Sequence, residues 1–451
     1  MTGDRDRVCV VGGGLAGIAA ALRLADAGVP VTLVEARPRL GGATYSFRRG
    51  DLTVDTGQHV FLRCYAAYRG LLRRLGSARH TVQQDAFSVP VLAPGARPLV
   101  LARSRRLPAP AHLLPTLARY RALPLPRRLG AIRAAAALRS VDPDDPGADD
   151  ASFGAWLASH RQDADTVRRL WDLICVAALN APAAEASLAL AARVFRTGLL
   201  DAADAADLGL PAAPLLDLHG RPARAALADL GGTVLTGVRV RGIVPGDGGF
   251  EIRTGAGRLP AAAVVLAVPH REAAGLVPAP AAPDRDRWSR LGATPIVNVH
   301  LHYARRVTGL PFAAVLDSPV QWVFDRTPAT VPGQYLVVSL SAADRLLRRP
   351  AADLIAEQLA ALTDLFPPAR RTPLRDCFVT REPRATFRQS PGTRAVRPPA
   401  QTRLPGLALA GAWTATGWPD TMEGAVRSGQ RAADVVLAHL GARTPTTEAL
   451  T

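Results

Sequence analysis

The chain has 451 residues, enough for two or three domains with their own cores, and its 48% hydrophobic and 21% charged residues are typical of a soluble globular protein. The formal net charge is +17, and all of the basic charge is arginine because the sequence contains no lysine. A genome rich in G and C would produce this bias without any functional demand; the alternative is attraction to a polyanionic surface. The absence of zinc-finger spacing and of a basic-aromatic strand favours an anionic membrane over nucleic acid as that surface.

The four cysteines, Cys9, Cys64, Cys175 and Cys377, form no CxxC pair. This scatter argues against a disulfide framework or a metal site and suits a reducing compartment. The charged stretch 2–7 leaves no room for a signal peptide, and no apolar run is long enough to span a bilayer. We therefore expect a cytoplasmic protein, or one that is peripheral on the inner face of the cell membrane.

The N-terminal elements form one recognisable unit. Residues 7–11 are expected to be a buried strand, 12–17 a tight glycine turn, 15–27 a helix that ends at Gly28, and 30–35 a second strand. A strand, glycine turn, helix and strand in about thirty residues make a βαβ unit, whose crossover is right-handed. The unit predicts a Rossmann-like dinucleotide site.

The rest of the chain is expected to contain both helices and strands. Helices are expected at 111–121, 127–139, 152–160, 164–179, 351–365 and 421–440, and strands at 295–303, 320–324, 335–340 and 407–411, with further short strands between 232 and 268. The apolar run at 263–268 (AVVLAV) is typical of a strand in a sheet that is covered on both faces.

This order predicts an α/β protein with a Rossmann-like cofactor domain in three discontinuous segments and an inserted α+β substrate domain. The cofactor domain is assigned to residues 1–75, 215–275 and 395–445. The substrate domain is assigned to residues 76–214, expected to be largely helical, and 276–394, expected to be mixed sheet and helix.

The glycine turn has the spacing of a phosphate-binding motif, Gly12-x-Gly14-x-x-Gly17. The first glycine permits the turn, the second lets a pyrophosphate approach the backbone, and the third lets helix and strand pack closely. Free N–H groups at the helix start then meet the phosphates. Glu35, at the end of the second strand, is placed to bind an adenosine ribose and disfavours a 2′-phosphate.

The residues after Glu35, ARPRLGG, resemble the E-A-x-x-R-x-G-G continuation of FAD-dependent amine oxidases, protoporphyrinogen oxidases and carotenoid desaturases. The resemblance implies that FAD is the cofactor and that Arg39, Gly41 and Gly42 contact its pyrophosphate and flavin side. Members of this group usually have a further arginine directly after the glycines, where this chain has Ala43.

Residues 409–431 (LAGAWTATGWPDTMEGAVRSGQR) are similar to the C-terminal motif of the same group. There a loop passes under the flavin ring, and a helix that opens with M-E-G-A points its N-terminus at the pyrimidine end, where reduced flavin carries negative charge. Gly411, Gly424 and Ala425 let the backbone lie close to the cofactor. Ala412 stands where relatives usually have an acidic residue.

Two segments narrow the resemblance to the squalene-associated branch, the hydroxysqualene dehydroxylases of bacterial squalene and hopanoid synthesis. These segments are 55–65 (DTGQHVFLRCY) and 416–429 (TGWPDTMEGAVRSG). The resemblance implies that reduced FAD gives a hydride to an allylic carbon while hydroxide leaves as water. The residues that it places at FAD are Gly12, Gly14, Leu15, Ala16, Gly17, Glu35, Ala36, Arg39, Gly41, Gly42, Gly57, Gln58, His59, Val238, Gly411, Ala412, Trp418, Thr421, Met422, Glu423 and Ala425.

The leaving hydroxide needs a general acid. His59 is the first candidate, with Asp420 and Glu423 as alternatives, and a structural role for His59 is weighed as the more common outcome. His300 and His302 lie on the same side of one expected strand, but no third ligand accompanies them, so no metal site is predicted.

A long isoprenoid must arrive from a bilayer or directly from an upstream squalene-pathway synthase. The segment 97–139, with Arg105, Arg106, Arg127 and Arg128, is a candidate contact with an anionic membrane, and the alternative is an ordinary solvated cap. Rival functions are a carotenoid desaturase or isomerase, and a flavin-binding subunit without catalysis. An amine or protoporphyrinogen oxidase is disfavoured because amine oxidases commonly hold a lysine near the flavin.

Overall fold

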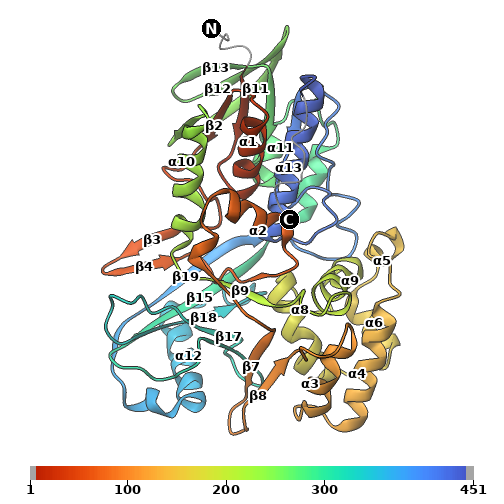
Figure 1. The fold of residues 1–451 in the computed structure, drawn as a ribbon, viewed down its shortest axis with the longest axis vertical. Coiled ribbons are helices and arrows are strands. Elements are labelled where there is room, and N and C mark those ends of the chain that lie inside the picture. Colours follow the sequence, from red (N-terminus) through yellow and green to blue (C-terminus); the bar gives the residue numbers. More distant parts are fainter. Residues whose placement is uncertain (1–6, 443–451) are drawn as a thin grey trace.

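The computed structural model describes residues 7–442, which form two parts stacked along the long axis of the molecule (Figure 1). The part that holds Arg7 and Ala442, the first and last described residues, is built on a parallel sheet, and the other part on a larger mixed sheet and a set of helices. The two sheets meet near the middle of the molecule, where the candidate site lies.

The parallel sheet draws its strands from three distant stretches of the chain. In spatial order it consists of β10 (Thr233–Thr236), β2 (Val31–Glu35), β1 (Val8–Val11), β14 (Ala263–Leu266) and β20 (Leu407–Leu409). All four residues of β1 and of β14 are buried, as in a sheet covered on both faces.

Four helices cover one face of this sheet: α1 (Leu15–Asp26), α2 (Ala66–Arg74), α10 (Arg221–Asp229) and α13 (Met422–His439). Helices α1 and α13 lie so close that a Cβ on Gly429 would stand 2.0 Å from the backbone oxygen of Ala16. The other face carries an antiparallel sheet of β11 (Val240–Gly246), β12 (Gly249–Thr254) and β13 (Gly257–Ala261), together with α11 (His270–Leu276).

The second part is built on a seven-stranded sheet whose pairs are antiparallel except for β16 with β7. In order its strands are β19 (Leu374–Thr386), β15 (Thr294–Tyr303), β18 (Gln334–Leu340), β17 (Trp322–Asp325), β16 (Phe312–Val315), β7 (Ser88–Leu92) and β8 (Leu99–Ala102). Helix α12 (Ala351–Leu365) packs on one face of this sheet.

A group of short helices packs beside the β16, β7 and β8 end of the sheet, against its opposite face. These helices are α3 (Leu114–Arg119), α4 (Leu125–Leu138), α5 (Pro146–Asp150), α6 (Phe153–Ser159), α7 (Ala164–Thr166), α8 (Asp172–Leu179) and α9 (Leu188–Phe195). Smaller pairings connect the two parts: the hairpin of β3 (Ser46–Arg49) with β4 (Leu52–Asp55), and β9 (Leu208–Pro211) between β5 (Phe61–Leu62) and β6 (Thr81–Gln83).

The segment 76–214 consists largely of helices, and it begins with strands β6, β7 and β8, two of which extend the large sheet. Two sequence expectations need correction. The single helix expected at 164–179 is broken by a π-helical turn at 167–171. The strand expected at 320–324 begins two residues later, at Trp322, because Val320 lies in the turn that leads from β16.

Candidate active site

The glycines of the turn between β1 and α1 serve two purposes: two of them are required by the packing of the protein, and one leaves open space. A Cβ on Gly12 would stand 2.3 Å from the backbone oxygen of Ala267, and one on Gly17 only 1.8 Å from the oxygen of Gly12. Packing of the protein itself therefore requires these two glycines. A Cβ on Gly14 meets nothing nearer than the Cα of Gly42, at 3.7 Å. The space above Gly14 is thus open, as a pyrophosphate passing the start of α1 requires.

Glu35 lies beside this turn. Its carboxylate accepts hydrogen bonds from the backbone N–H groups of Gly13 and Arg37, both at 2.7 Å. Val238 is held next to it by a bond from its backbone N–H to the oxygen of Glu35. Ala36 continues from β2 at the same end of the sheet. Each carboxylate oxygen keeps a further lone pair, so Glu35 can fix the turn and accept a ribose hydroxyl together.

Arg39 reaches over the paired glycines. Its guanidinium lies 3.1 Å from the centre of the Tyr45 ring, and it donates a long bond of 3.4 Å to the oxygen of Gly42. Gly41 and Gly42 both have positive φ, at 109° and 58°, which side chains rarely adopt. Stacking on Tyr45 holds a delocalised cation beside the open space at Gly14, and among residues 7–442 Arg39 forms no ion pair with a carboxylate, as phosphate recognition requires.

The C-terminal loop is fixed by a buried arginine that the sequence did not single out. Arg397 donates to the backbone oxygens of Ala412 and Thr414, and burial lowers its pKa to about 10. Gly411 has φ 139°, and a Cβ there would stand 2.4 Å from the indole nitrogen of Trp413. In this chain the loop is held from behind by Arg397, while Ala412 offers only its backbone.

A cavity of about 440 Å³ opens beside the glycine turn and continues into the second part of the molecule. The predicted FAD residues that line it are Leu15, Gly41, Gly57, Gln58, His59, Thr421, Met422 and Ala425. Helix α13 begins at this cavity, so its N-terminal N–H groups face the same space. Eight of the residues expected at FAD therefore lie together at one end of the cavity, and their role at FAD stays a prediction.

The floor of the cavity is one face of the seven-stranded sheet. From β8 to β19 it carries Leu101, Val89, Phe312, Phe324, Trp322, Ser339, Ile296 and Thr386. Six inter-strand steps of about 4.8 Å give this floor a width of roughly 29 Å. The floor is apolar at the β8 end and becomes polar at β18 and β19. The opposite wall includes Leu173, Ile174, Ala177 and Ala178 of α8.

Asp420 lies at the polar end, and its exposed surface faces the cavity. One carboxylate oxygen, Oδ2, accepts a hydrogen bond from the backbone N–H of Phe387 at 2.8 Å, and its own N–H donates to Gln389 at 2.9 Å. Gln389 is fully buried and also donates to the oxygen of Leu179 at the end of α8. Burial raises the pKa of Asp420 to about 6, against the opposing effects of the Phe387 N–H and the charge of Arg397.

His59 also lines the cavity, but its chemistry does not suit a general acid. Its Nδ1 lies 3.0 Å from the backbone oxygen of Gly57, which accepts a hydrogen bond only from a protonated nitrogen. Burial lowers the pKa of His59, so the ring is neutral at pH 7 and Nε2 presents a lone pair. This corrects the first choice of acid and favours the structural role weighed beside it.

Glu423 is not at the cavity. Its side chain is fully buried, and its two oxygens accept from the backbone N–H groups of Ala67 and Tyr68, at 3.1 and 2.8 Å. It also pairs with Arg427 at 2.7 Å. Glu423 therefore caps the start of α2, and its assignment as a catalytic residue was wrong because both oxygens serve the fold. Trp418 packs edge-on against Tyr65 at 5.9 Å, outside the residues that line the cavity.

The paired histidines of β15 have structural partners. His300 contacts the hydroxyl groups of Tyr335 and Thr380, at 2.7 and 2.9 Å, and His302 contacts the backbone oxygen of Pro332 at 2.9 Å. Within residues 7–442 no group of three or more His, Cys, Asp or Glu residues is arranged to hold a metal ion.

Asn180 is a cavity residue that sequence reasoning missed. It ends α8 in the left-handed conformation, with φ 52°. Its side chain forms hydrogen bonds near the ends of strands β15, β18 and β19. The amide donates to the oxygen of Thr294 and to the hydroxyl of Thr386, and accepts from the N–H of Ala342. The Asn after a helical run is a C-cap signal, but the partners lie far along the chain.

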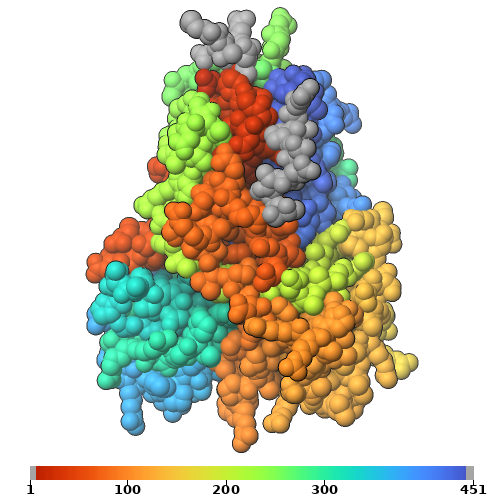
Figure 2. Space-filling view, viewed as in Figure 1, coloured from red at the N-terminus to blue at the C-terminus, as the bar shows by residue number. Residues whose placement is uncertain are grey.

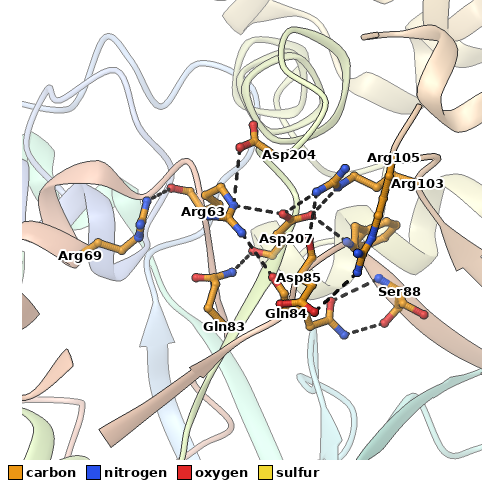
Figure 3. Close-up of polar contacts among 11 residues, drawn as sticks. Arg63, Arg69, Gln83, Gln84, Asp85, Ser88, Arg103, Arg105, Asp204 and Asp207 are labelled. Carbon is orange, nitrogen blue, oxygen red and sulfur yellow. Dashed lines mark hydrogen bonds and ion pairs between the residues drawn. The ribbon is translucent and has the colours of Figure 1, made fainter. Parts of the chain in front are cut away.

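Asp207 is a buried carboxylate next to residues of the cavity wall, and Figure 3 shows its polar contacts. Asp207 is fully buried and accepts two bonds from Arg103, at 2.7 and 2.9 Å, one from Arg63 at 3.0 Å, and one from the N–H of Phe87 at 2.7 Å. We call this group the Asp207 clamp. Burial acts to raise the pKa of Asp207, but these bonds and the charge of Arg103 outweigh it and lower the pKa.

Comparison with known proteins places these features in context. A family model described as flavin containing amine oxidoreductase matches residues 15–437. Hydroxysqualene dehydroxylase of Rhodopseudomonas palustris is 32% identical, with 96% of this chain and 98% of the relative covered; that of Sinorhizobium fredii is 30% identical, with 95% and 98% covered. Cyclohexylamine oxidase from Brevibacterium oxydans has a TM-score of 0.71 at 21% identity, over 97% of this chain and all of that one, which confirms the predicted fold.

Proposed function

This chain belongs to the flavin-containing amine oxidoreductase family, and we propose that it reductively removes the hydroxyl group of hydroxysqualene to give squalene. It is a FAD-dependent oxidoreductase. The observation that carries the finer proposal is Asp420, a carboxyl group with a raised pKa at the flavin end of a long apolar cavity. Such an acid is needed when a hydroxyl group leaves, and not when a hydrocarbon is oxidised.

The protein's part in the reaction follows from the contacts of Asp420. Bound reduced FAD supplies the hydride that forms the new C–H bond. The Phe387 N–H occupies Oδ2 of Asp420, a residue that lines the cavity, so the proton is held on Oδ1. As the C–O bond breaks, this proton goes to the departing hydroxide and forms water. The apolar floor from β17 to β8 holds the isoprenoid chain and excludes other water.

The residues predicted to hold FAD fit that group. Gly14 leaves room for the pyrophosphate, Arg39 lies beside this room, and α1 begins there without any side-chain cap of its own. The start of α13 and the backbone of Gly57 and Gln58 face the cavity where the flavin ring would lie. Backbone groups supply much of this site, in keeping with Ala43 and Ala412 at two positions where relatives have charged side chains.

The reduction is tested with purified holoprotein that is reduced under anaerobic conditions and mixed with hydroxysqualene. Reoxidation of the flavin with formation of squalene is expected. If the reduced protein stays reduced while the oxidised protein desaturates phytoene, the carotenoid-desaturase alternative holds, and zeta-carotene desaturase of Zea mays is a relative at 25% identity. If hydroxysqualene does not reoxidise the reduced flavin and phytoene does not reduce the oxidised flavin, the result favours a non-catalytic flavin subunit.

We also propose that the segment 82–129 contacts an anionic membrane. Six of the seven exposed large apolar side chains among residues 7–442 lie in it: Val82, Val100, Leu107, Leu114, Leu125 and Leu129. Residues 86–141 contain ten arginines and no acidic residue, and Arg105 and Arg106 are exposed. The segment lies at the lower end of the molecule in Figure 2, away from the parallel sheet. Apolar side chains among exposed arginines are typical of interfacial contact.

The structure refines the arginines involved. Arg127 pairs with Asp163 and Asp165, and Arg128 donates to the backbone oxygens of Leu123 and Ala118, so these two serve the fold. No helix among residues 7–442 is both long and apolar enough to cross a membrane. A membrane contact would deliver the isoprenoid, made by an upstream squalene-pathway synthase, next to the apolar end of the cavity: on β8, Val100 points outward while Leu101 lines the cavity.

Sedimentation with vesicles tests this contact. The wild type is expected to bind vesicles that contain phosphatidylglycerol more tightly than vesicles of phosphatidylcholine. Leu125→Ser with Leu129→Ser should weaken binding, and Leu230→Ser, at the exposed leucine outside the segment, is the matched control. Equal binding by all three proteins would contradict the proposal.

A further inference from the structure

Two serine hydroxyl groups face the cavity at its polar end. Ser339 is near the end of β18 and Ser341 follows it, and both line the cavity. On β18 the side chains of Leu336, Val338 and Leu340 enter the core under α12, so the alternate positions face the cavity. Among residues 7–442 the structure gives neither serine hydroxyl a hydrogen-bond partner, although the backbone of Ser341 is held by Gln321.

The surroundings leave these hydroxyl groups with little choice of partner. Ser339 is flanked on the sheet by Asn298 and Trp322. Asn298 is fully buried, and its Oδ1 also has no partner among the described residues. A buried polar group without a partner costs about 1–3 kcal/mol. The neighbouring floor toward β8 is apolar, so the two half-buried hydroxyl groups can bond only to water or to a molecule bound in the cavity.

The serines lie on the same side of the cavity as Asp420. Asn180 accepts from the N–H of Ala342, next to Ser341, at 2.6 Å and donates to the hydroxyl of Thr386 at 3.1 Å. The next residue, Phe387, donates to Asp420 at 2.8 Å. Three hydrogen bonds and the peptide link from Thr386 to Phe387 therefore connect the backbone beside Ser341 to Asp420. Ser341 and Asp420 both line the cavity.

We propose that Ser339 and Ser341 form a subsite for the hydroxyl group of an aliphatic alcohol, whose chain lies along the apolar floor toward β8. Each serine can both donate and accept, so one alcohol oxygen can receive a bond and give one. In the function proposed above, on which this use of the subsite rests, the serines hold the hydroxyl of the isoprenoid within reach of Asp420 and retain the water that is formed.

Binding to the oxidised holoprotein tests the subsite without turnover, through the change in flavin absorbance. The probes are decan-1-ol and decane, and the pair hydroxysqualene and squalene. We expect the wild type to prefer each alcohol at least tenfold, the ratio that corresponds to 1.4 kcal/mol and about two net hydrogen bonds. The double variant Ser339→Ala with Ser341→Ala should lose this preference while its affinity for the hydrocarbons stays the same.

Ser289→Ala, at an exposed serine far from the cavity, is the matched control and should keep the preference. An unchanged preference in the double variant would overturn the subsite, because the serines would then hold only water. An equal loss of alcohol and hydrocarbon affinity would overturn it too. The experiments distinguish the two proposals. A wild type that prefers decan-1-ol but does not reduce hydroxysqualene would support the subsite and contradict the proposed reaction. A wild type that reduces hydroxysqualene without preferring the alcohols would support the reaction and contradict the subsite.

Discussion

Asp207, which is fully buried, and Asp420, which lines the cavity, have opposite electrostatic environments. Asp207 receives four hydrogen bonds, three of them from arginine side chains, and its pKa is lowered. Asp420 receives one, from a backbone N–H, and its pKa is raised to about 6. The first carboxylate is held permanently charged, and the second can carry a proton near neutral pH.

The difference shows how the same side chain serves the fold in one place and chemistry in another. A carboxylate matched by guanidinium groups has no lone pair or proton to offer a substrate. A carboxyl group that burial keeps near its titration point can give a proton at little cost. The charge of Arg397 acts to lower the pKa of Asp420, but its guanidinium donates to backbone oxygens of the C-terminal loop and to the hydroxyl of Thr416. Among residues 7–442 it makes no ion pair with Asp420.

The largest effect is expected from Asp420→Asn. Asparagine keeps the size and the acceptor for the Phe387 N–H but has no proton of suitable acidity to give. The rate of hydroxysqualene reduction should fall by about 10²–10⁴-fold, as for loss of a general acid, with FAD content unchanged. Single-turnover reoxidation of the reduced flavin measures it. A rate within a few-fold of the wild type would remove Asp420 from its role.

Asp207→Ala should lower the stability of the fold, because it removes the carboxylate of the Asp207 clamp. It leaves Arg103, whose side chain is 11% exposed, without its carboxylate, and loss of one partner of a buried pair costs about 3–5 kcal/mol. The midpoint of urea unfolding should drop accordingly. The control is Asp85→Asn, because that carboxylate is 88% exposed and lies 3.6 Å from Arg105, where little change is expected. Equal behaviour of the two variants would contradict the clamp.

The rate of the reaction and the stability of the fold should both depend on pH through Asp420. The rate should fall as the pH rises through about 6, because Asp420 then loses the proton that it donates, and this limb should vanish in Asp420→Asn. The sign for stability is the same: a folded pKa above the unfolded value means that ionisation of Asp420 lowers stability as the pH rises between 3.8 and about 6. The Asn variant should therefore melt no lower than the wild type at pH 7.5. A rate that rises with pH over this range would indicate a base.

The smallest effect is expected from Glu423→Gln. One amide oxygen can still accept from α2, but the charge opposite Arg427 and one cap bond are lost, a cost of about 1 kcal/mol. The melting temperature should fall slightly and the single-turnover rate should stay near that of the wild type. A loss of rate as large as that of Asp420→Asn would restore Glu423 as a catalytic candidate.

The sequence predicted best the elements that carry local signals. Helix 351–365 matches α12, and the glycine turn and the M-E-G-A helix lie where their motifs indicate, because caps, periodicity and glycine spacing are local properties. Strand β19 was missed. As an edge strand with half-exposed charged residues and a proline, LRDCFVTREPRAT has none of the apolar alternation of a central strand.

For the site, too, the sequence supported expectations where the signals are local and missed contacts that are not. The cofactor end depends on continuous motifs, whereas the polar end depends on contacts between residues far apart in the sequence, such as Asn180 with Thr386 and Phe387 with Asp420. Glu423 and Asp420 stand in one motif, and the sequence offered no means of telling them apart. Only the direction of each side chain decides that one caps a helix and the other faces the cavity.

The contact between α1 and α13 has a consequence for how the chain is made. Gly429, which packs against Ala16, lies 413 residues further along the chain and leaves the ribosome later. At about 5–20 residues per second, some 20–80 s separate their synthesis. During that interval the apolar face of α1 has no partner from α13. We therefore expect nascent chains to depend on chaperones until the final helix emerges, and release of a chain cut before residue 420 to yield aggregate and not a smaller flavoprotein.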